Sequence, residues 1–126
     1  GSIAVTGEGN STTTNLQQGL AKAWATFNAT GTAATRDTFN VSGLTDNGTG
    51  DFSFAFSSNF ATANAYVAGG LVAHSSQSDA TYTLRAYSSS TLTTSSARMN
   101  MVYNTDSAQG VSDYAYGSTL MHGDLA

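Results

Sequence analysis

The chain has 126 residues, 40% of them hydrophobic, with six Phe, six Tyr and one Trp, which is the size of one ordinary domain and too apolar for a disordered chain. Its formal net charge is −4, and its four Lys and Arg residues are too few for the basic patches that bind nucleic acid or anionic membranes. The absence of Cys excludes disulfides and zinc sites built on thiolates.

The composition favours strands over helices. Charged residues make up only 10% of the chain, and 17 Ser, 19 Thr and 13 Gly with no Pro suit short strands joined by turns. In chain order, residues 3–6 form the first candidate strand, and the polar stretch 7–15 is expected to be a loop. We therefore expect an all-β fold with a surface covered mainly by hydroxyl groups.

Residues 16–27 are the one ambiguous segment. Asn15 could cap a helix, whereas Gly19 weakens a helix by about 1 kcal/mol relative to Ala. We favour a loop or a single turn up to Gly19, followed by a strand over residues 20–28. In that strand the ring of Trp24 faces one side and three apolar residues face the other: Ala23, Ala25 and Phe27.

The strongest local signal is a β-hairpin over residues 38–57. The first strand is predicted at 38–44 and the return strand at 51–57. The turn between them has four residues that we expect to be structural: Asp46, Asn47, Gly48 and Gly50. Asn-Gly tolerates positive φ, and the further Gly favours a bulged loop. Before the hairpin, we expect Arg36 and Asp37 to form an ion pair.

The return strand decides the architecture. Its three Phe residues are two apart, so all three rings face one side of a sheet: Phe52, Phe54 and Phe56. Such a face has to be covered by a second layer. After a turn at Gly69-Gly70 we expect further strands at 71–74, 80–87, 97–103 and 111–120, a loop at 75–79, and a frayed tail at 122–126.

These elements predict about eight short strands in one domain that spans residues 1–126. Their spacing is typical of an antiparallel β-sandwich of jelly-roll or immunoglobulin-like type. Gly1 and Ser2 are either native or the scar of a cleaved tag, in which case the domain is cut from a longer protein.

No motif predicts catalysis, a cofactor or a metal site. His74 and His122 stand alone, although a three-fold axis would bring three copies of one His together. The stretch 46–51 has oxygen ligands near a Gly but lacks the full calcium-loop pattern and its distal Glu. Glu8 is the only Glu, so a Glu pair for glycoside hydrolysis is absent. We therefore expect a protein that is not an enzyme.

Surface binding is the remaining class of function. Four Tyr residues are candidates for stacking on sugars or for burial in a protein interface: Tyr87, Tyr103, Tyr114 and Tyr116. The alternative for each is a half-buried position in a sheet. A surface with few charges also suits close packing between identical subunits, because few charges have to be desolvated.

Two stretches carry a resemblance to a known family. Residues 12–32, TTTNLQQGLAKAWATFNATGT, and 36–56, RDTFNVSGLTDNGTGDFSFAF, resemble a domain that recurs in tail-fibre and other structural proteins of tailed bacteriophages. The matching pattern is K-A-W-x-x-F-[ND]-x-x-G-T, then R-D-[ST]-x-N-V-S-x-[IL]-T-D-N-G-T-G-D-[YF]. The final residues, SDYAYGSTLMHGDLA, depart from the apolar last strand of that family.

The resemblance implies a virion protein that forms a homotrimer at or near the end of a fibre and adheres to a bacterial surface glycan or protein. It makes Trp24 and Phe27 candidates for subunit contacts. The alternative is a capsid or tail decoration domain whose partners are other virion proteins. A spike that degrades polysaccharide is a third hypothesis, against our expectation of no catalysis.

Overall fold

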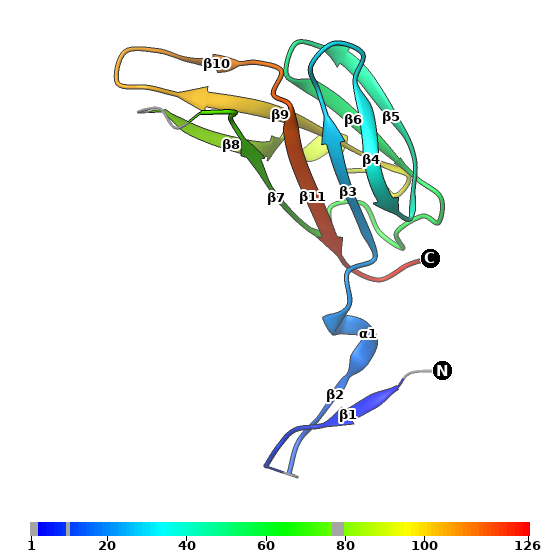
Figure 1. Ribbon diagram of the computed structural model, residues 1–126. Helices are drawn as coiled ribbons and strands as arrows, with labels where there is room; N and C mark the ends of the chain where they lie inside the picture. Colours follow the sequence, from blue (N-terminus) through cyan, green and yellow to red (C-terminus); the bar gives the residue numbers. More distant parts are fainter. Residues whose placement is uncertain (1–2, 10, 77–79) are drawn as a thin grey trace.

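The computed structural model describes residues 3–9, 11–76 and 80–126, and these form an antiparallel β-sandwich with an N-terminal extension (Figure 1). The first sheet has the order β4 (Ala34–Phe39), β3 (Ala23–Asn28), β11 (Tyr116–His122) and β7 (Val67–Ala73). The second sheet has the order β5 (Val41–Gly48), β6 (Asp51–Phe56) and β9 (Ser96–Asn104), and both β8 (Thr81–Ala86) and β10 (Gln109–Val111) pair with β9. The predicted all-β sandwich is confirmed, with more strands than the eight expected.

The N-terminal arm, residues 3–9 and 11–19, extends away from the sandwich (Figure 1). It holds β1 (Ala4–Thr6), β2 (Thr13–Asn15) and the single turn α1 (Leu16–Gly19). The side chain of Asn15 caps this turn by accepting a hydrogen bond from the Gln17 amide at 2.9 Å. The predicted turn up to Gly19 is confirmed, but a loop throughout 7–15 was wrong, because the β-branched Thr13 and Thr14 pair with β1.

The predicted hairpin is present, but its first strand is divided between the two sheets. β4 ends at Phe39, Asn40 has φ 55°, and β5 begins at Val41 in the other sheet. The Asn40 side chain stabilises this corner: its amide donates to the carbonyls of Lys22 and Ser58 at 3.0 Å, and its oxygen accepts from the Ser58 amide at 2.6 Å. A short polar side chain that tolerates positive φ therefore connects three segments.

The turn of the hairpin is shorter than predicted, because β5 continues to Gly48. The register shifts between Asp46 and Gly48, and Gly48 and Gly50 have φ of 135° and 63°. The Asp46 carboxylate accepts from the Gly48 amide at 2.9 Å, while Asn47 donates to the Ser53 hydroxyl at 2.8 Å. A Cβ on Gly50 would lie only 2.9 Å from the Met101 carbonyl oxygen, so this position requires glycine.

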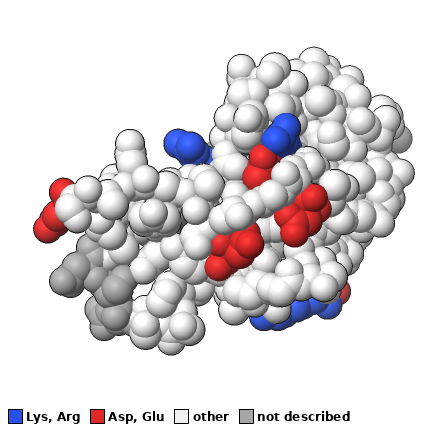
Figure 2. All heavy atoms as spheres, turned by 90° about the horizontal axis from the view of Figure 1, so that it is seen from above, with Lys and Arg blue, Asp and Glu red and all other residues white. Residues whose placement is uncertain are grey.

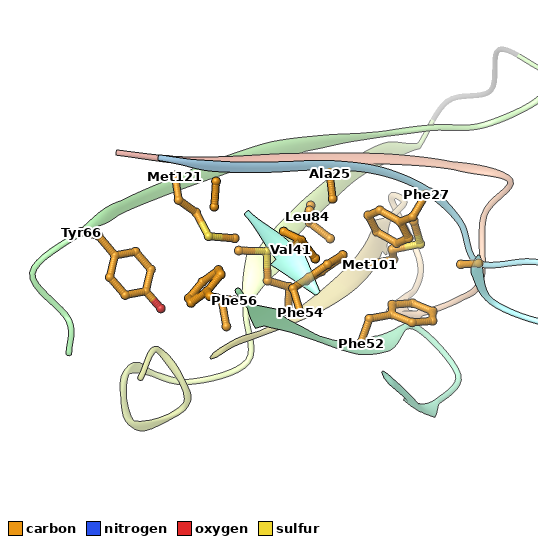
Figure 3. Packing of buried hydrophobic residues seen from close by; sticks show 14 of the residues in the cluster. Ala25, Phe27, Val41, Phe52, Phe54, Phe56, Tyr66, Leu84, Met101 and Met121 are labelled. Carbon is orange, nitrogen blue, oxygen red and sulfur yellow. The ribbon is translucent and has the colours of Figure 1, made fainter. Parts of the chain in front are cut away.

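The core lies between the two sheets (Figure 3). Phe52, Phe54 and Phe56 of β6 are buried, as their spacing predicts. Phe27 of the first sheet contacts this row, with ring centroids 5.6 Å from Phe52 and 5.0 Å from Phe54. At the other end of the core, burial raises the pKa of Tyr66 to about 12.

Phe27 is therefore a core residue, and its assignment as a subunit contact was wrong. None of its surface is exposed, at 0%. The inward face of β3 is made by alternate residues, all buried: Ala23, Ala25 and Phe27. Trp24 lies on the outward face, as predicted, so it alone of the two candidates stays available to a partner.

Three predicted boundaries in the second half of the chain are corrected. The turn at Gly69-Gly70 was wrong, because β7 runs through both residues and pairs with β11 along its length. The stretch 111–120 divides into β10 and β11 around residues 112–115. The tail is paired rather than frayed, since Phe60 forms a β-bridge with Leu125. The predicted loop 75–79 lies partly outside the described residues.

Candidate functional site

A cluster of aromatic rings and loop side chains lies at the end of the sandwich that we call the distal end. The chain enters the sandwich at β3 and leaves it after β11 at one end (Figure 1). The connections β3–β4, β5–β6 and β9–β11 lie at the other end, together with the end of β7 and the start of β8. Figure 2 looks onto this end and shows a mostly uncharged surface, with acidic groups near the centre of the view, one of them beside a basic group. Sugar-binding and protein-binding surfaces can both be built on such loops, because a rigid sandwich positions them.

Three rings contact one another at this end. His74 follows β7, Tyr82 lies in β8 and Tyr114 precedes β11. The His74 and Tyr82 rings are stacked, with centroids 5.3 Å apart and planes at 14°. Tyr114 meets both rings edge to face, at 5.5 Å from His74 and 5.1 Å from Tyr82. Burial raises the pKa of Tyr114, against a smaller opposing effect of a hydrogen bond with the Ser112 side chain.

An open hollow of about 240 Å³ lies beside these rings. We call it the distal hollow. It is lined by two of the three rings, those of His74 and Tyr114. The polar residues that line it are Thr30, Ser75, Ser112 and Asp113. Its volume is below the roughly 300–1,000 Å³ of pockets for drug-sized ligands, so it suits one ring-sized group.

The backbone around the distal hollow is tied to the sandwich. The Asp113 carboxylate accepts from the Gly50 amide at 2.6 Å, so the loop before β11 is held to the tip of the hairpin. The Tyr114 carbonyl accepts from the Ala29 amide at 3.0 Å. The Nδ1 of His74 accepts from the Ser76 amide at 3.1 Å. These contacts fix the rings in place, which lowers the entropic cost of binding.

Tyr87, another predicted binding residue, lies on the outer face of the second sheet. Its ring is covered by Arg98, whose guanidinium carbon lies 4.0 Å from the ring centroid. Arg98 also makes two hydrogen bonds to the Asp51 carboxylate, from Nε at 2.8 Å and from a terminal nitrogen at 2.6 Å. The Tyr87 ring contacts the Arg98 guanidinium, and that guanidinium is paired with the Asp51 carboxylate, so these groups already interact within the domain.

This ion pair predicts a loss of stability in acid. The Arg98 hydrogen bond holds the pKa of Asp51 below its usual value, so the folded chain binds this proton less tightly than the unfolded chain does. The contribution is therefore complete above the unfolded pKa of about 3.9 and is lost as pH falls through the lower folded value. We expect the melting temperature of Asp51→Asn to fall less between pH 5 and pH 2.5 than that of the unsubstituted chain.

Asp106→Asn, in the exposed turn between β9 and β10, is the matched control and should keep the full acid dependence. Equal acid profiles for Asp51→Asn and the unsubstituted chain would show that the Arg98 contact contributes nothing to stability. Melting followed by circular dichroism at each pH measures both variants.

The other two predicted tyrosines are not in the distal hollow. Tyr103 is half-buried, and a Cβ on Gly110 would lie 2.9 Å from its hydroxyl, so its ring packs closely on β10. Tyr116 begins β11 and lies 5.8 Å from the Arg36 guanidinium. Of the four candidates only Tyr114 lines the hollow. The sequence does not predict that Tyr82 and His74 contact the Tyr114 ring, because only pairing between distant segments of the chain brings these three residues together.

The expected ion pair between Arg36 and Asp37 is not formed. Neighbouring residues of a strand point to opposite faces. Arg36 instead donates to the Phe27 carbonyl at 3.0 Å, and the Asp37 carboxylate accepts from the Thr38 amide at 2.9 Å. Within the described residues, no group of three or more His, Asp and Glu side chains is arranged to hold a metal ion. No helix in the described ranges is long and apolar enough to span a bilayer.

Comparison with known proteins adds no relative. No family model matches the chain, and no curated protein and no solved structure matches it either.

Proposed function

We propose that this chain is a structural domain of a bacteriophage virion, of tail-fibre or spike type, which attaches to the host surface as a trimer. The resemblance of residues 12–32 and 36–56 supports the viral assignment. The observation that carries the binding role is the distal hollow, because packed rings and polar side chains meet there at the end opposite to where the chain enters the sandwich. The distal hollow then lies at the far end of a fibre.

The chemistry of the distal hollow suits a sugar ring of a surface glycan. The rings of His74 and Tyr114 offer apolar faces for the C–H groups of a sugar, and the Asp113 carboxylate and Thr30 hydroxyl accept its hydroxyl protons. One such site is small and therefore weak. Three identical sites on one fibre end bind together, which raises the overall affinity by orders of magnitude.

The test compares the two histidines of the chain. His74→Ala removes a ring from the distal hollow, whereas His122→Ala changes β11 outside it. We expect His74→Ala to weaken binding to host surface polysaccharide by about three- to tenfold per site, since a ring contact of this kind contributes about 0.5–1.5 kcal/mol. His122→Ala should bind as the unsubstituted chain does, provided that both variants have the same native mass.

Equal binding by both variants would contradict the role of the distal hollow. Binding only to capsids or tails, with none to cells or polysaccharide, would support the alternative of a decoration domain. Release of reducing ends from the polysaccharide would show catalysis and overturn the proposal.

A further inference from the structure

The outer face of the first sheet carries large apolar side chains that nothing in the described chain covers. Val67 is 71% exposed, Phe39 53%, Leu71 51% and Leu120 46%, and Trp24, which is partly buried, lies among them. We call these five residues the apolar stripe. The largest apolar patch on a typical monomer covers about 300–600 Å², and a patch of that size is often a binding surface.

The strand register makes these residues neighbours. Phe39 of β4 pairs with Trp24 of β3, and Trp24 pairs with Leu120 of β11. On the other side Leu120 pairs with Gly69 of β7, and Val67 and Leu71 flank this glycine on the same face. The apolar stripe therefore crosses all four strands of the sheet without a break.

The alternate residues of the same strands face the core, so the apolar stripe cannot turn inward. Ala23 and Ala25 of β3 and Met121 of β11 are buried between the sheets. Beside the apolar stripe most outward positions are small and polar, with Thr26 paired to Ser118 and Ser118 to Leu71. Two larger polar residues border it on the same face: Asp37, which pairs with Thr26, and His122, which pairs with Val67. A partner surface centred on the apolar stripe would thus desolvate little charge, provided that Asp37 stays at the edge of the contact.

We propose that the apolar stripe is the surface through which copies of this chain contact one another. The four exposed residues, Val67, Phe39, Leu71 and Leu120, present on the order of 400 Å² of surface, since a whole aromatic side chain presents about 150–250 Å² and these are about half exposed or more. A standard interface takes about 800 Å² from each partner, as an apolar centre with a polar rim. The apolar stripe supplies such a centre, and the surrounding hydroxyl groups supply the rim.

A second copy fits this surface better than a transient partner does. Surfaces that bind and release other proteins are about as polar as the rest of a protein, whereas contacts between identical subunits are more apolar. Three copies with their apolar stripes turned toward a common axis would bury Trp24 and Leu120 together. The number three rests on the proposed function, but the choice of surface does not.

Trp24 provides a test in the unsubstituted chain, because it is the only Trp and lies within the apolar stripe. The native mass and the Trp fluorescence are measured together as the chain is diluted from about 100 µM to about 0.1 µM, where mass action favours the monomer. We expect the mass to fall to 12.9 kDa and the emission to move to longer wavelength over the same range. A monomer throughout, or dissociation without any change in emission, would overturn the proposal.

Leu120→Lys tests the same surface by substitution, with Val111→Lys as its control. Val111 is similarly exposed, at 40%, but lies on β10 of the second sheet. We expect the native mass of Leu120→Lys to fall about threefold at a concentration at which Val111→Lys keeps its mass. Retained mass in Leu120→Lys would overturn the choice of surface. An assembly of two copies that Leu120→Lys dissociates would support the surface and contradict the trimer of the proposed function.

Discussion

Phe27→Ala is expected to lower the free energy of unfolding by about 3–5 kcal/mol, the usual cost of removing a buried Phe side chain. The reason is its place between the sheets, with ring centroids within 5.6 Å of Phe52 and 5.0 Å of Phe54. Its ring also fills the space above Gly117, where an added Cβ would lie 2.5 Å from it. A domain of this size has about 5–15 kcal/mol of stability in total, so the variant should be close to unfolding.

Phe39→Ala is the matched control, since Phe39 has the same side chain on the neighbouring strand but is 53% exposed. Its effect should stay within about 0.5 kcal/mol. Both variants are measured by urea denaturation, followed by circular dichroism, at a concentration at which the chain is monomeric. If Phe27→Ala unfolded at the same urea concentration as Phe39→Ala, the two-layer core would be contradicted.

The parts of the fold that the sequence predicts are those with a local cause. The alternation of Phe52, Phe54 and Phe56 requires a covered face, and the structure covers it with Phe27. The Asn-Gly turn predicts the hairpin because its φ requirement involves only neighbouring residues. Local cause also explains the single turn after Asn15, whose side chain bonds the amide two residues on.

The parts that sequence reasoning missed depend on distant neighbours. The division of the hairpin strand at Asn40 depends on its bonds to Lys22 and Ser58, each 18 residues away. Pairing with β1 makes Thr13–Asn15 a strand, although the same residues read as a polar loop by composition. Neither contact leaves a periodic signal in the sequence.

The candidate site could be predicted only in part for the same reason. Tyr114 is a candidate by residue type, whereas its ring contacts with His74 and Tyr82 join two connections of the sandwich to β8. Tyr103 was an equal candidate by type, yet its ring packs on Gly110 within the second sheet. Residue type therefore indicated the chemistry of the site, and only the topology located it.

The sequence predicts a turn at Gly70, but in the structure this residue allows a close approach of two strands. A Cβ at this position would overlap the Ser118 carbonyl oxygen of β11 and come within 2.9 Å of a methyl group of Leu84. A side chain could move aside, but a carbonyl within the β7–β11 ladder cannot move without breaking the pairing. Next to it, the Thr119 hydroxyl donates to the Gly69 carbonyl at 2.9 Å, which ties the same two strands together.

We therefore expect Gly70→Ala to lower the free energy of unfolding by at least about 3 kcal/mol, at or beyond the upper end of the usual cost of overpacking. Gly69→Ala is the control: it adds the same methyl group one residue earlier, where nothing lies within 4 Å. Its effect should be neutral or stabilising by up to about 1 kcal/mol, because Ala restricts the unfolded chain more than Gly does. Urea midpoints of the two variants, measured on the monomer, decide the matter. A flexible turn at Gly69-Gly70 would tolerate both substitutions, whereas a continuous β7 tolerates only one.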